Sequence, residues 1–263
     1  MNLRINQLIV DFTRVCNSHC KLCHIWKTKN PPTLKAKYIR KLLSQLDSIR
    51  IFYVSGGEPY INPEIFDIAQ ALLDYRPEAL WMAATNSIWK GTADAIKKIG
   101  DMGVKLGIVD LSLEGNREQH DYIRGTKGNY DTVLYTMKKL QEYNIKFQLV
   151  SITDNGVAEA KRLGFENMKG RMRFGERVNM PHKKKILYKV ENCQGAKADL
   201  CCTPDGDIYP CEDYRPELYL GNIKTMDLKD MPFKKVRKYI ESGKCSPCQM
   251  SCWTGDRTWA GEQ

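Results

Sequence analysis

Apolar residues follow two alternating patterns along this chain. In the segments 33–50 and 129–143 they recur every three or four residues, which places them on one face of a helix. Between such segments lie short apolar runs, as at 51–54 and 80–84, which are typical of buried strands. Strands that alternate with helices predict a parallel sheet.

The pattern predicts six strand–helix units before about residue 180. The expected strands are 8–12, 51–55, 80–86, 104–113, 145–152 and one near 171–174. The expected helices are 33–50, 63–75, 92–102, 129–143 and a short helix after 152. Beyond this point the Asp205-Gly206 pair, flanked by apolar residues, predicts a β-hairpin, and a lysine-rich helix follows. We therefore expect two domains, 1–182 and 183–263.

Composition limits the class of protein. At 263 residues, of which 42% are hydrophobic, the chain can bury a sizeable core. It contains no apolar run near the roughly 18 residues of a membrane span, and its N-terminus lacks the apolar core of a signal peptide. We therefore expect a cytoplasmic protein without a membrane partner. The net charge of +10 favours anionic partners, and the basic run 182–185 is either a solvated loop or a contact for phosphate or an acidic peptide.

Ten cysteines in a chain without a signal peptide indicate metal ligation in a reducing compartment. Three of them, Cys16, Cys20 and Cys23, have the spacing C-x3-C-x2-C. A four-iron cluster normally takes four thiolates, so a loop that offers three leaves one iron open to another ligand. Zinc is the alternative, with His19 or His24 as the fourth ligand.

The strand at 51–55 leads into Gly56-Gly57-Glu58-Pro59, about 33 residues after the cysteine loop. Glycines let a backbone approach a ligand closely, and Glu58 adds a carboxylate at the strand end. This cysteine spacing followed by this turn resembles the signature of the radical S-adenosylmethionine (radical SAM) enzymes. The resemblance implies an α/β fold built on a partial (β/α)6 barrel, shorter than the eight-unit barrel. It also implies that the open iron binds SAM and that an electron from a flavodoxin- or ferredoxin-type donor cleaves it, giving a 5′-deoxyadenosyl radical that abstracts hydrogen from a substrate.

In such a barrel, ligands gather at the carboxyl ends of the strands. The resemblance implies that Leu22 lies near the adenine and that Arg124 faces the SAM carboxylate, which a planar guanidinium matches. The full set of implied SAM contacts is Leu22, Gly56, Gly57, Glu58, Asn86, Ser112 and Arg124. Ordinary turn chemistry is the alternative for Asn86 and Ser112, and a surface ion pair is the alternative for Arg124.

The last third of the chain holds seven cysteines. Their pattern is similar to the SPASM and Twitch domains of radical SAM enzymes, which carry auxiliary iron–sulfur clusters. The C-terminal run, shortened to C-x2-C-x3-C, favours a small cysteine-rich α+β domain of the Twitch kind with one auxiliary cluster, and hence two [4Fe-4S] clusters in all. Its ligands would be Cys193, Cys211, Cys245, and Cys248 or Cys252, with zinc as the alternative.

The pair Cys201-Cys202 is left over, and both residues fall in the first strand of the hairpin. Neighbours in a strand point to opposite faces, so at most one thiol faces the barrel mouth. One interpretation is two small buried hydrophobes. Another is a hydrogen-atom donor that quenches a substrate radical, as in radical SAM peptide epimerases, with Cys202 the favoured candidate. A third is ligation of the auxiliary cluster.

Four functions stay open at this point. The first is epimerisation or crosslinking of a ribosomally made peptide, with the leader bound by the barrel mouth and the basic surface because the segment before Cys16 is short for a separate recognition domain. The second is oxidation of a small alcohol or aminosugar by a Twitch-type dehydrogenase. The third is modification of a nucleotide or RNA, which leaves nucleic acid open as a partner although no RNA-binding motif is present. A non-enzymatic iron–sulfur scaffold is the fourth, and it would need no SAM site.

Overall fold

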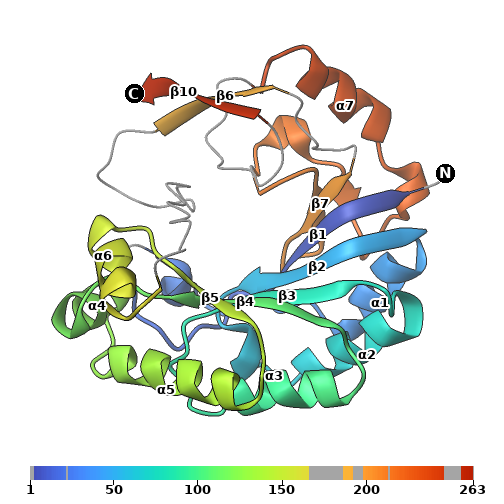
Figure 1. Ribbon diagram of the computed structural model, residues 1–263. Coiled ribbons are helices and arrows are strands. Elements are labelled where there is room, and N and C mark those ends of the chain that lie inside the picture. Colours follow the sequence, from blue (N-terminus) through green and yellow to red (C-terminus); the bar gives the residue numbers. More distant parts are fainter. Residues whose placement is uncertain are drawn as a thin grey trace.

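The computed structural model describes residues 3–21, 23–165, 186–191, 198–212, 214–245 and 256–262. Its centre is an eight-stranded sheet with the strand order β5-β4-β3-β2-β1-β7-β8-β9. Figure 1 shows this sheet as a curved wall with helices along its convex side. The architecture is the partial α/β barrel that the sequence predicts, followed by a small C-terminal part.

The described part of the barrel has five parallel strands: β1 (Arg4–Thr13), β2 (Ser48–Gly56), β3 (Leu80–Thr85), β4 (Leu106–Ser112) and β5 (Phe147–Val150). The helices of this part are α1 (Ala36–Ser44), α2 (Ile65–Tyr75), α3 (Thr92–Asp101), α4 (Arg117–Arg124), α5 (Asn129–Glu142) and α6 (Asp154–Arg162). Two single 3-10 turns, η1 (Ile25–Lys27) and η2 (Pro59–Ile61), lie in the loops after β1 and β2.

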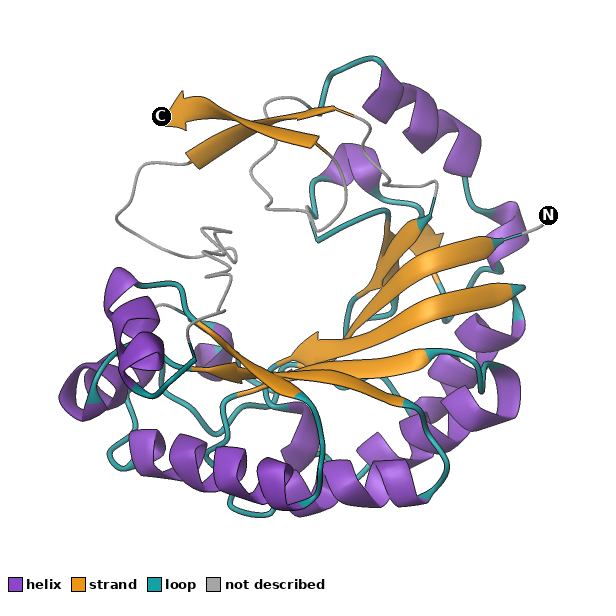
Figure 2. Cartoon of the chain, viewed as in Figure 1, coloured by secondary structure: helices purple, strands orange, loops and turns teal. Residues whose placement is uncertain are grey.

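The helices bury the faces that their apolar periodicity marks. In α2 these are Ile65, Ile68 and Leu72, which follow one another at helical spacing. They belong to one apolar core with the strand residues Phe52 and Val54. Figure 2 shows the helices covering one face of the sheet, which leaves the other as the inner face of the barrel. Burial of each such side chain contributes about 1.5–3 kcal/mol, so this core fixes the positions of the strand ends.

The C-terminal part continues the same sheet. The strand β7 (Asp199–Cys202) pairs with β1 in parallel, and β8 (Asp207–Tyr209) returns antiparallel to it. This is the predicted hairpin, with Gly206 at a φ of +89° in its turn. The other elements are η3 (Pro216–Leu218), β9 (Gly221–Asn222), η4 (Leu228–Asp230) and α7 (Phe233–Glu241), and a two-stranded sheet of β6 (Ile186–Glu191) and β10 (Asp256–Glu262).

Two sequence predictions differ from the structure. The helix predicted at 33–50 ends at Ser44, because the residues from Ser48 onward pair with β1 as part of β2. The helix α4 was not predicted. The strand expected near 171–174, the basic run 182–185 and the domain boundary at 182/183 all lie outside the described residues. Within the described parts of the chain, no helix has both the length and the apolar character that crossing a bilayer requires.

Strand register sets which side chains share a level on the inner face. Asp11 pairs with Ser55, Ala84 pairs with Asp110, and Asp110 pairs with Gln148. Asp11, Ser55, Asp110 and Gln148 form a polar level across the sheet, interrupted by Ala84 on β3. One level closer to the amino ends of the strands lies an apolar cluster made of Ile9, Tyr53, Met82 and Cys201.

Candidate functional site

The cysteine loop begins where β1 ends. Cys16, Cys20 and Cys23 are free thiols, with Cys20 buried and the other two partly exposed. Burial raises the pKa of the Cys16 thiol to about 11. A thiolate at this place therefore needs a positive partner, and a bound metal ion supplies one. The case for a cluster still rests on the spacing of the thiols, because among the described residues no three His, Cys, Asp or Glu side chains surround a single metal-ion position.

The glycine turn is pressed against the start of this loop. The Gly57 N–H donates to the Thr13 carbonyl at 2.7 Å, and the Glu58 N–H donates to the Val15 carbonyl at 2.8 Å. A Cβ on Gly57 would lie 2.1 Å from the Val15 oxygen, and Gly56 has a φ of +117°. The two glycines thus allow a backbone approach that no side chain permits. The turn and the cysteine loop are one structural unit.

Glu58 ties the end of β2 to the end of β3. Its side chain is 1% exposed and accepts hydrogen bonds from the Thr85 hydroxyl (2.8 Å), the Asn86 N–H (2.7 Å) and the Tyr60 N–H (3.4 Å). Burial raises the pKa of this carboxyl to about 7, against the opposing effect of these hydrogen bonds. Its carboxylate oxygens therefore already hold the neighbouring strand end in place.

Asn86 carries this connection back to the cysteine loop. Its side-chain nitrogen donates to the Asn17 side chain at 2.9 Å and lies 3.7 Å from the Cys16 sulfur. The next residue, Ser87, has a φ of +57°, a region that favours glycine, and its buried hydroxyl has no hydrogen-bond partner among the described residues. Cys16, the glycine turn and the end of β3 are thereby brought together, as the sequence predicts.

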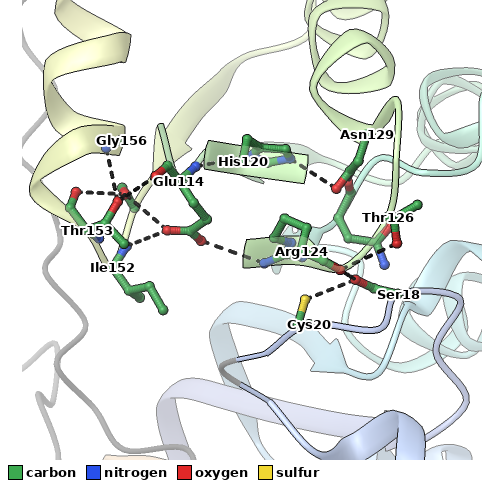
Figure 3. Close-up of polar contacts among 12 residues, drawn as sticks. Ser18, Cys20, Glu114, His120, Arg124, Thr126, Asn129, Ile152, Thr153 and Gly156 are labelled. Carbon is green, nitrogen blue, oxygen red and sulfur yellow. Dashed lines mark hydrogen bonds and ion pairs between the residues drawn. The ribbon is translucent and has the colours of Figure 1, made fainter. Parts of the chain in front are cut away.

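Figure 3 shows the other side of the site, where Glu114 and Arg124 face each other. One Glu114 oxygen accepts from the Ser151 hydroxyl and the Ile152 N–H, both at 3.1 Å, and the other lies 3.7 Å from an Arg124 nitrogen. The Arg124 Nε is buried without a partner among the described residues. Burial alone would lower the pKa of Arg124, but Cys20, Glu114, Cys16 and Glu58 are near enough to raise it. A cation with an unused donor therefore lies beside the cysteine loop.

The helix that carries Arg124 also holds the cysteine loop. The last carbonyls of a helix have no partner within it. Here the Ile123 carbonyl accepts from the Lys21 N–H, and the Arg124 carbonyl accepts from the Ser18 hydroxyl, both at 2.9 Å. The Ser18 hydroxyl also lies 2.9 Å from the Cys20 sulfur. Gly125, at a φ of +62°, ends α4 directly against the His19 carbonyl.

A buried histidine joins these two sides. His120 accepts from the Glu114 N–H through Nδ1 (3.1 Å), so its proton is on Nε2, which faces the Asn129 side-chain oxygen at 3.0 Å. Asn129 in turn donates to the Asn86 carbonyl at 2.8 Å. Burial, and then the charge of Arg124, lower the pKa of His120 to about 4, so it is neutral. Sequence reasoning missed this link, and missed Ser18, Glu114 and Asn129, because each acts across separate strand ends.

The remaining predicted residues are placed as follows. Ser112 is the last residue of β4 and is partly buried. Cys211 and Cys245 are partly buried and pack against the main core. Leu22, Cys193, Cys248 and Cys252 lie outside the described residues.

The vicinal cysteines point to opposite faces, but in the reverse of the predicted order. Cys202 packs in the main core on the helix side of the sheet, whereas Cys201 belongs to the inner-face cluster. The structure therefore places Cys201, and not the favoured Cys202, on the inner face, because the register of β7 with β1 sets Cys201 beside Ile9. The Cys201 sulfur lies 3.2 Å from the Tyr214 hydroxyl, which donates to Asp11 at 2.6 Å.

Comparison with known families agrees with the site. Residues 10–169 match the model of the radical SAM superfamily. The chain belongs to this superfamily. Residues 193–253 match the SPASM model, an iron–sulfur cluster-binding domain. As a member of this superfamily, the chain binds SAM and the [4Fe-4S] cluster of the superfamily. The second match assigns iron–sulfur cluster binding to the C-terminal part. The residues fit both groups, since three free thiols share one loop and the buried Arg124 Nε has no acceptor among the residues that the structure describes.

The individual relatives described here are at most 28% identical to this chain. The AdoMet-dependent heme synthase of Methanosarcina barkeri is 28% identical over 144 residues, which are 53% of this chain and 40% of that protein. The subtilosin biosynthesis protein AlbA of Bacillus subtilis is 22% identical over 262 residues, covering 81% of this chain and 56% of its own. A solved structure, anSMEcpe with bound AdoMet, has a TM-score of 0.62 at 16% identity and covers 96% of this chain and 85% of its own. The chain thus spans 40% and 56% of the length of these two curated relatives, and the structural likeness shows the fold.

Proposed function

We propose that Cys16, Cys20 and Cys23 bind three irons of a [4Fe-4S] cluster and that SAM occupies the fourth. Leu22, Gly56, Gly57, Glu58, Asn86, Ser112 and Arg124 surround the SAM. The unpartnered Nε of Arg124 supports this assignment, since a carboxylate ligand satisfies it while Glu114 holds the other end of the guanidinium. Glu58 acts mainly by fixing the backbone of Asn86, because its oxygens already accept three hydrogen bonds.

The auxiliary cluster, in this proposal, uses Cys193, Cys211, Cys245, and Cys248 or Cys252. The match of residues 193–253 to an iron–sulfur cluster-binding domain supports a set of ligands drawn from these cysteines. The domain organisation 1–182 and 183–263 belongs to the same proposal.

We infer that the substrate is a peptide, and that the reaction is hydrogen abstraction followed by inversion at a carbon centre or by crosslinking. SAM on the reduced cluster supplies the 5′-deoxyadenosyl radical. The observation that carries the proposal is the Cys201 thiol on the inner face, one level below the polar level of Asp11 and Asp110. Inversion needs hydrogen returned to the opposite face of the substrate carbon, and an S–H bond is weaker than N–H or O–H bonds of backbone and water.

The relatives give secondary support. The likeness to AlbA, a bacteriocin biosynthesis protein, reaches over 81% of this chain, whereas that to the heme synthase covers 53%. One structure of anSMEcpe holds AdoMet together with a peptide, in the same fold. On the inner face, the carboxylates of Asp11 and Asp110 form no ion pair with any described Lys or Arg, and Asp110 accepts from Tyr53 (2.7 Å) and Gln148 (2.5 Å). No described basic side chain therefore neutralises these two carboxylates, and we expect a neutral or cationic reacting segment.

In this proposal, the chain's own residues have separate roles. Glu58, Asn86 and His120 fix the strand ends, and α4 holds the cysteine loop through Ser18 and Lys21. Arg124 orients the SAM carboxylate. Cys201, held as a neutral thiol because burial raises its pKa well above the ordinary value, keeps the hydrogen that it returns.

The test uses reconstituted enzyme, SAM and dithionite in anaerobic D2O with candidate peptides, followed by mass spectrometry and chiral analysis. We expect deoxyadenosine and one deuterium at an inverted Cα. Cys201→Ala should still form deoxyadenosine and keep both clusters, yet yield no inverted product. Cys202→Ala is the matched control, on the same strand but facing the core, and should lose stability while it still inverts the substrate.

Inversion by Cys201→Ala at the wild-type rate would remove the thiol from the reaction. If the wild type instead oxidises a small alcohol or aminosugar without deuterium uptake, the dehydrogenase alternative stands. Product formed only on a nucleotide or RNA would support the third class.

A further inference from the structure

Three tyrosines form a row that runs from the Cys201 thiol to the protein surface. We call Tyr214, Tyr209 and Tyr219 the tyrosine row. The Tyr214 hydroxyl lies 3.2 Å from the Cys201 sulfur. The ring centroids of Tyr214 and Tyr209 are 5.2 Å apart, and those of Tyr209 and Tyr219 are 5.6 Å apart. Tyr219 is 42% exposed, whereas Cys201 is fully buried, so the row spans the distance between the thiol and solvent.

The buried end of the row has a carboxylate as a hydrogen-bond partner. The Tyr214 hydroxyl donates to Asp11 at 2.6 Å. A carboxylate only accepts, so the single hydroxyl hydrogen of Tyr214 goes to Asp11, and the Cys201 S–H must be the donor toward the tyrosine oxygen. The thiol hydrogen, the phenol and a proton acceptor are thus aligned in one hydrogen-bonded chain.

This alignment addresses a consequence of the proposed function, on which the inference rests. A thiol that gives its hydrogen atom to a substrate radical is left as a sulfur radical. Cys201 has no exposed surface, so a bound peptide has to displace the side chains over it to reach the sulfur, and a reductant in solution cannot do so. Each further turnover therefore needs a route that returns one electron and one proton to the sulfur.

We propose that the tyrosine row is that route. The Tyr214 hydroxyl turns from Asp11 to the sulfur and passes its hydrogen atom across 3.2 Å, so that the O–H bond breaks, the S–H bond re-forms and the oxidised centre moves to Tyr214. One electron then enters at Tyr219 and travels through Tyr209 to Tyr214. A proton reaches the Tyr214 oxygen through Asp11, and the phenol is restored. The electron comes from the one-electron reductant that SAM cleavage already requires, a flavodoxin- or ferredoxin-type protein or dithionite, and the net change is one electron and one proton added to the sulfur radical.

The order of residues follows from the hairpin. Cys201 on β7 pairs directly with Tyr209 on β8, so both side chains lie on the inner face. Tyr214, in the segment after β8, then reaches back to the sulfur and to Asp11.

The test compares Tyr→Phe variants, which keep the ring packing and remove only the hydroxyl. The probe is the peptide that the wild type inverts, and the readout is product per enzyme against time. We expect Tyr214→Phe and Tyr209→Phe to give a first burst of about one product per chain and then to turn over at least tenfold more slowly. Tyr219→Phe should slow the later turnovers as well. The control is Tyr135→Phe, a tyrosine on α5 that is 41% exposed and distant in sequence from the row.

A second measurement does not depend on product. Freeze-quenched wild type should show a tyrosyl radical by electron paramagnetic resonance, with a line shape that narrows when the protein contains ring-deuterated tyrosine. Tyr214→Phe should lack this signal. Wild-type rates beyond the first turnover in Tyr214→Phe or Tyr209→Phe would overturn the row, and in Tyr219→Phe they would overturn its surface end. If the wild type itself inverts no peptide, the proposed function is refuted. If the wild type inverts a peptide and the Tyr→Phe variants turn over at the same rate, the tyrosine row alone is refuted.

Discussion

Gly125→Ala should loosen the radical SAM cluster without unfolding the barrel. Gly125 ends α4 at a φ of +62°, and a Cβ built there would lie 2.1 Å from the His19 carbonyl oxygen. Real Cβ contacts essentially never fall below 3.0 Å, so the gap must open by roughly 0.9 Å. The obstructing atom is backbone of the cysteine loop, between Cys16 and Cys20, so the loop itself has to move.

The magnitude has two parts. Left-handed backbone geometry costs an alanine roughly 1–2 kcal/mol relative to glycine. Displacement of reacting groups by about 1 Å can lower a rate on the order of 10²-fold. We therefore expect a modest loss of stability, together with a large loss of deoxyadenosine formation and of iron from the first cluster.

A control variant separates the loss of stability from the loss of iron and of deoxyadenosine formation. Gly128 also has a positive φ, +81°, but a Cβ there would meet no atom of the described residues within 4 Å. Gly128→Ala should therefore show a similar loss of stability with normal iron content and normal SAM cleavage. The assays are iron and sulfide analysis after anaerobic reconstitution, thermal unfolding, and deoxyadenosine by liquid chromatography. If Gly125→Ala retains the iron and cleavage rate of Gly128→Ala, contact between α4 and the cysteine loop does not position the cluster.

Three further predictions concern the same site. Replacing Cys16, Cys20 and Cys23 with Ala should leave about half the iron and abolish SAM cleavage; a preparation with one zinc and no iron would contradict the cluster assignment. His120 has a pKa of about 4 in the fold, below its ordinary value, so its contribution to the free energy of unfolding is full above pH about 6.5 and falls by up to about 3 kcal/mol toward pH about 4. Denaturant unfolding of His120→Gln between these pH values should lack this pH dependence of stability, and a pH dependence equal to that of the wild type refutes the prediction. Glu114→Gln leaves Arg124 without its buried counter-charge, which should lower the free energy of unfolding of the SAM-free protein by roughly 1–3 kcal/mol. Added SAM should then raise the melting temperature of the variant more than that of the wild type. Equal rises in melting temperature would mean that Arg124 does not meet the SAM carboxylate.

The barrel was predictable because its signals are local. Helix and strand periods mark which face of each element is buried, and β2, β3 and β4 appear close to where the apolar runs predict them. The helix α4 was missed because its buried face is short, with His120 as its one buried residue. Its ends nevertheless carry signals that were available: a capping box formed by Asn116 and Gln119, and Gly125 after the last turn.

The candidate site was predictable only in part, for a physical reason. The residues at strand ends could be listed because the carboxyl edge of a parallel sheet collects them. Which atoms meet depends on loops from distant segments: Ser18 reaches Arg124, and Asn129 reaches Asn86. The pairing of β6 with β10 was likewise not predictable, since it joins segments far apart in the chain. Local patterns do not encode such long-range contacts.

Apolar packing on the helix side of the sheet determines which of Cys201 and Cys202 lies on the inner face. A shift of one residue between β7 and β1 would exchange the two thiols between faces. Leu200, Cys202 and Ile208 oppose that shift because all three are buried in the main core, on the helix side. The apolar side of the hairpin therefore selects the thiol on the inner side. The same register sets Tyr209 opposite Cys201, so the hydrogen donor and the route that would reload it depend on one set of apolar contacts.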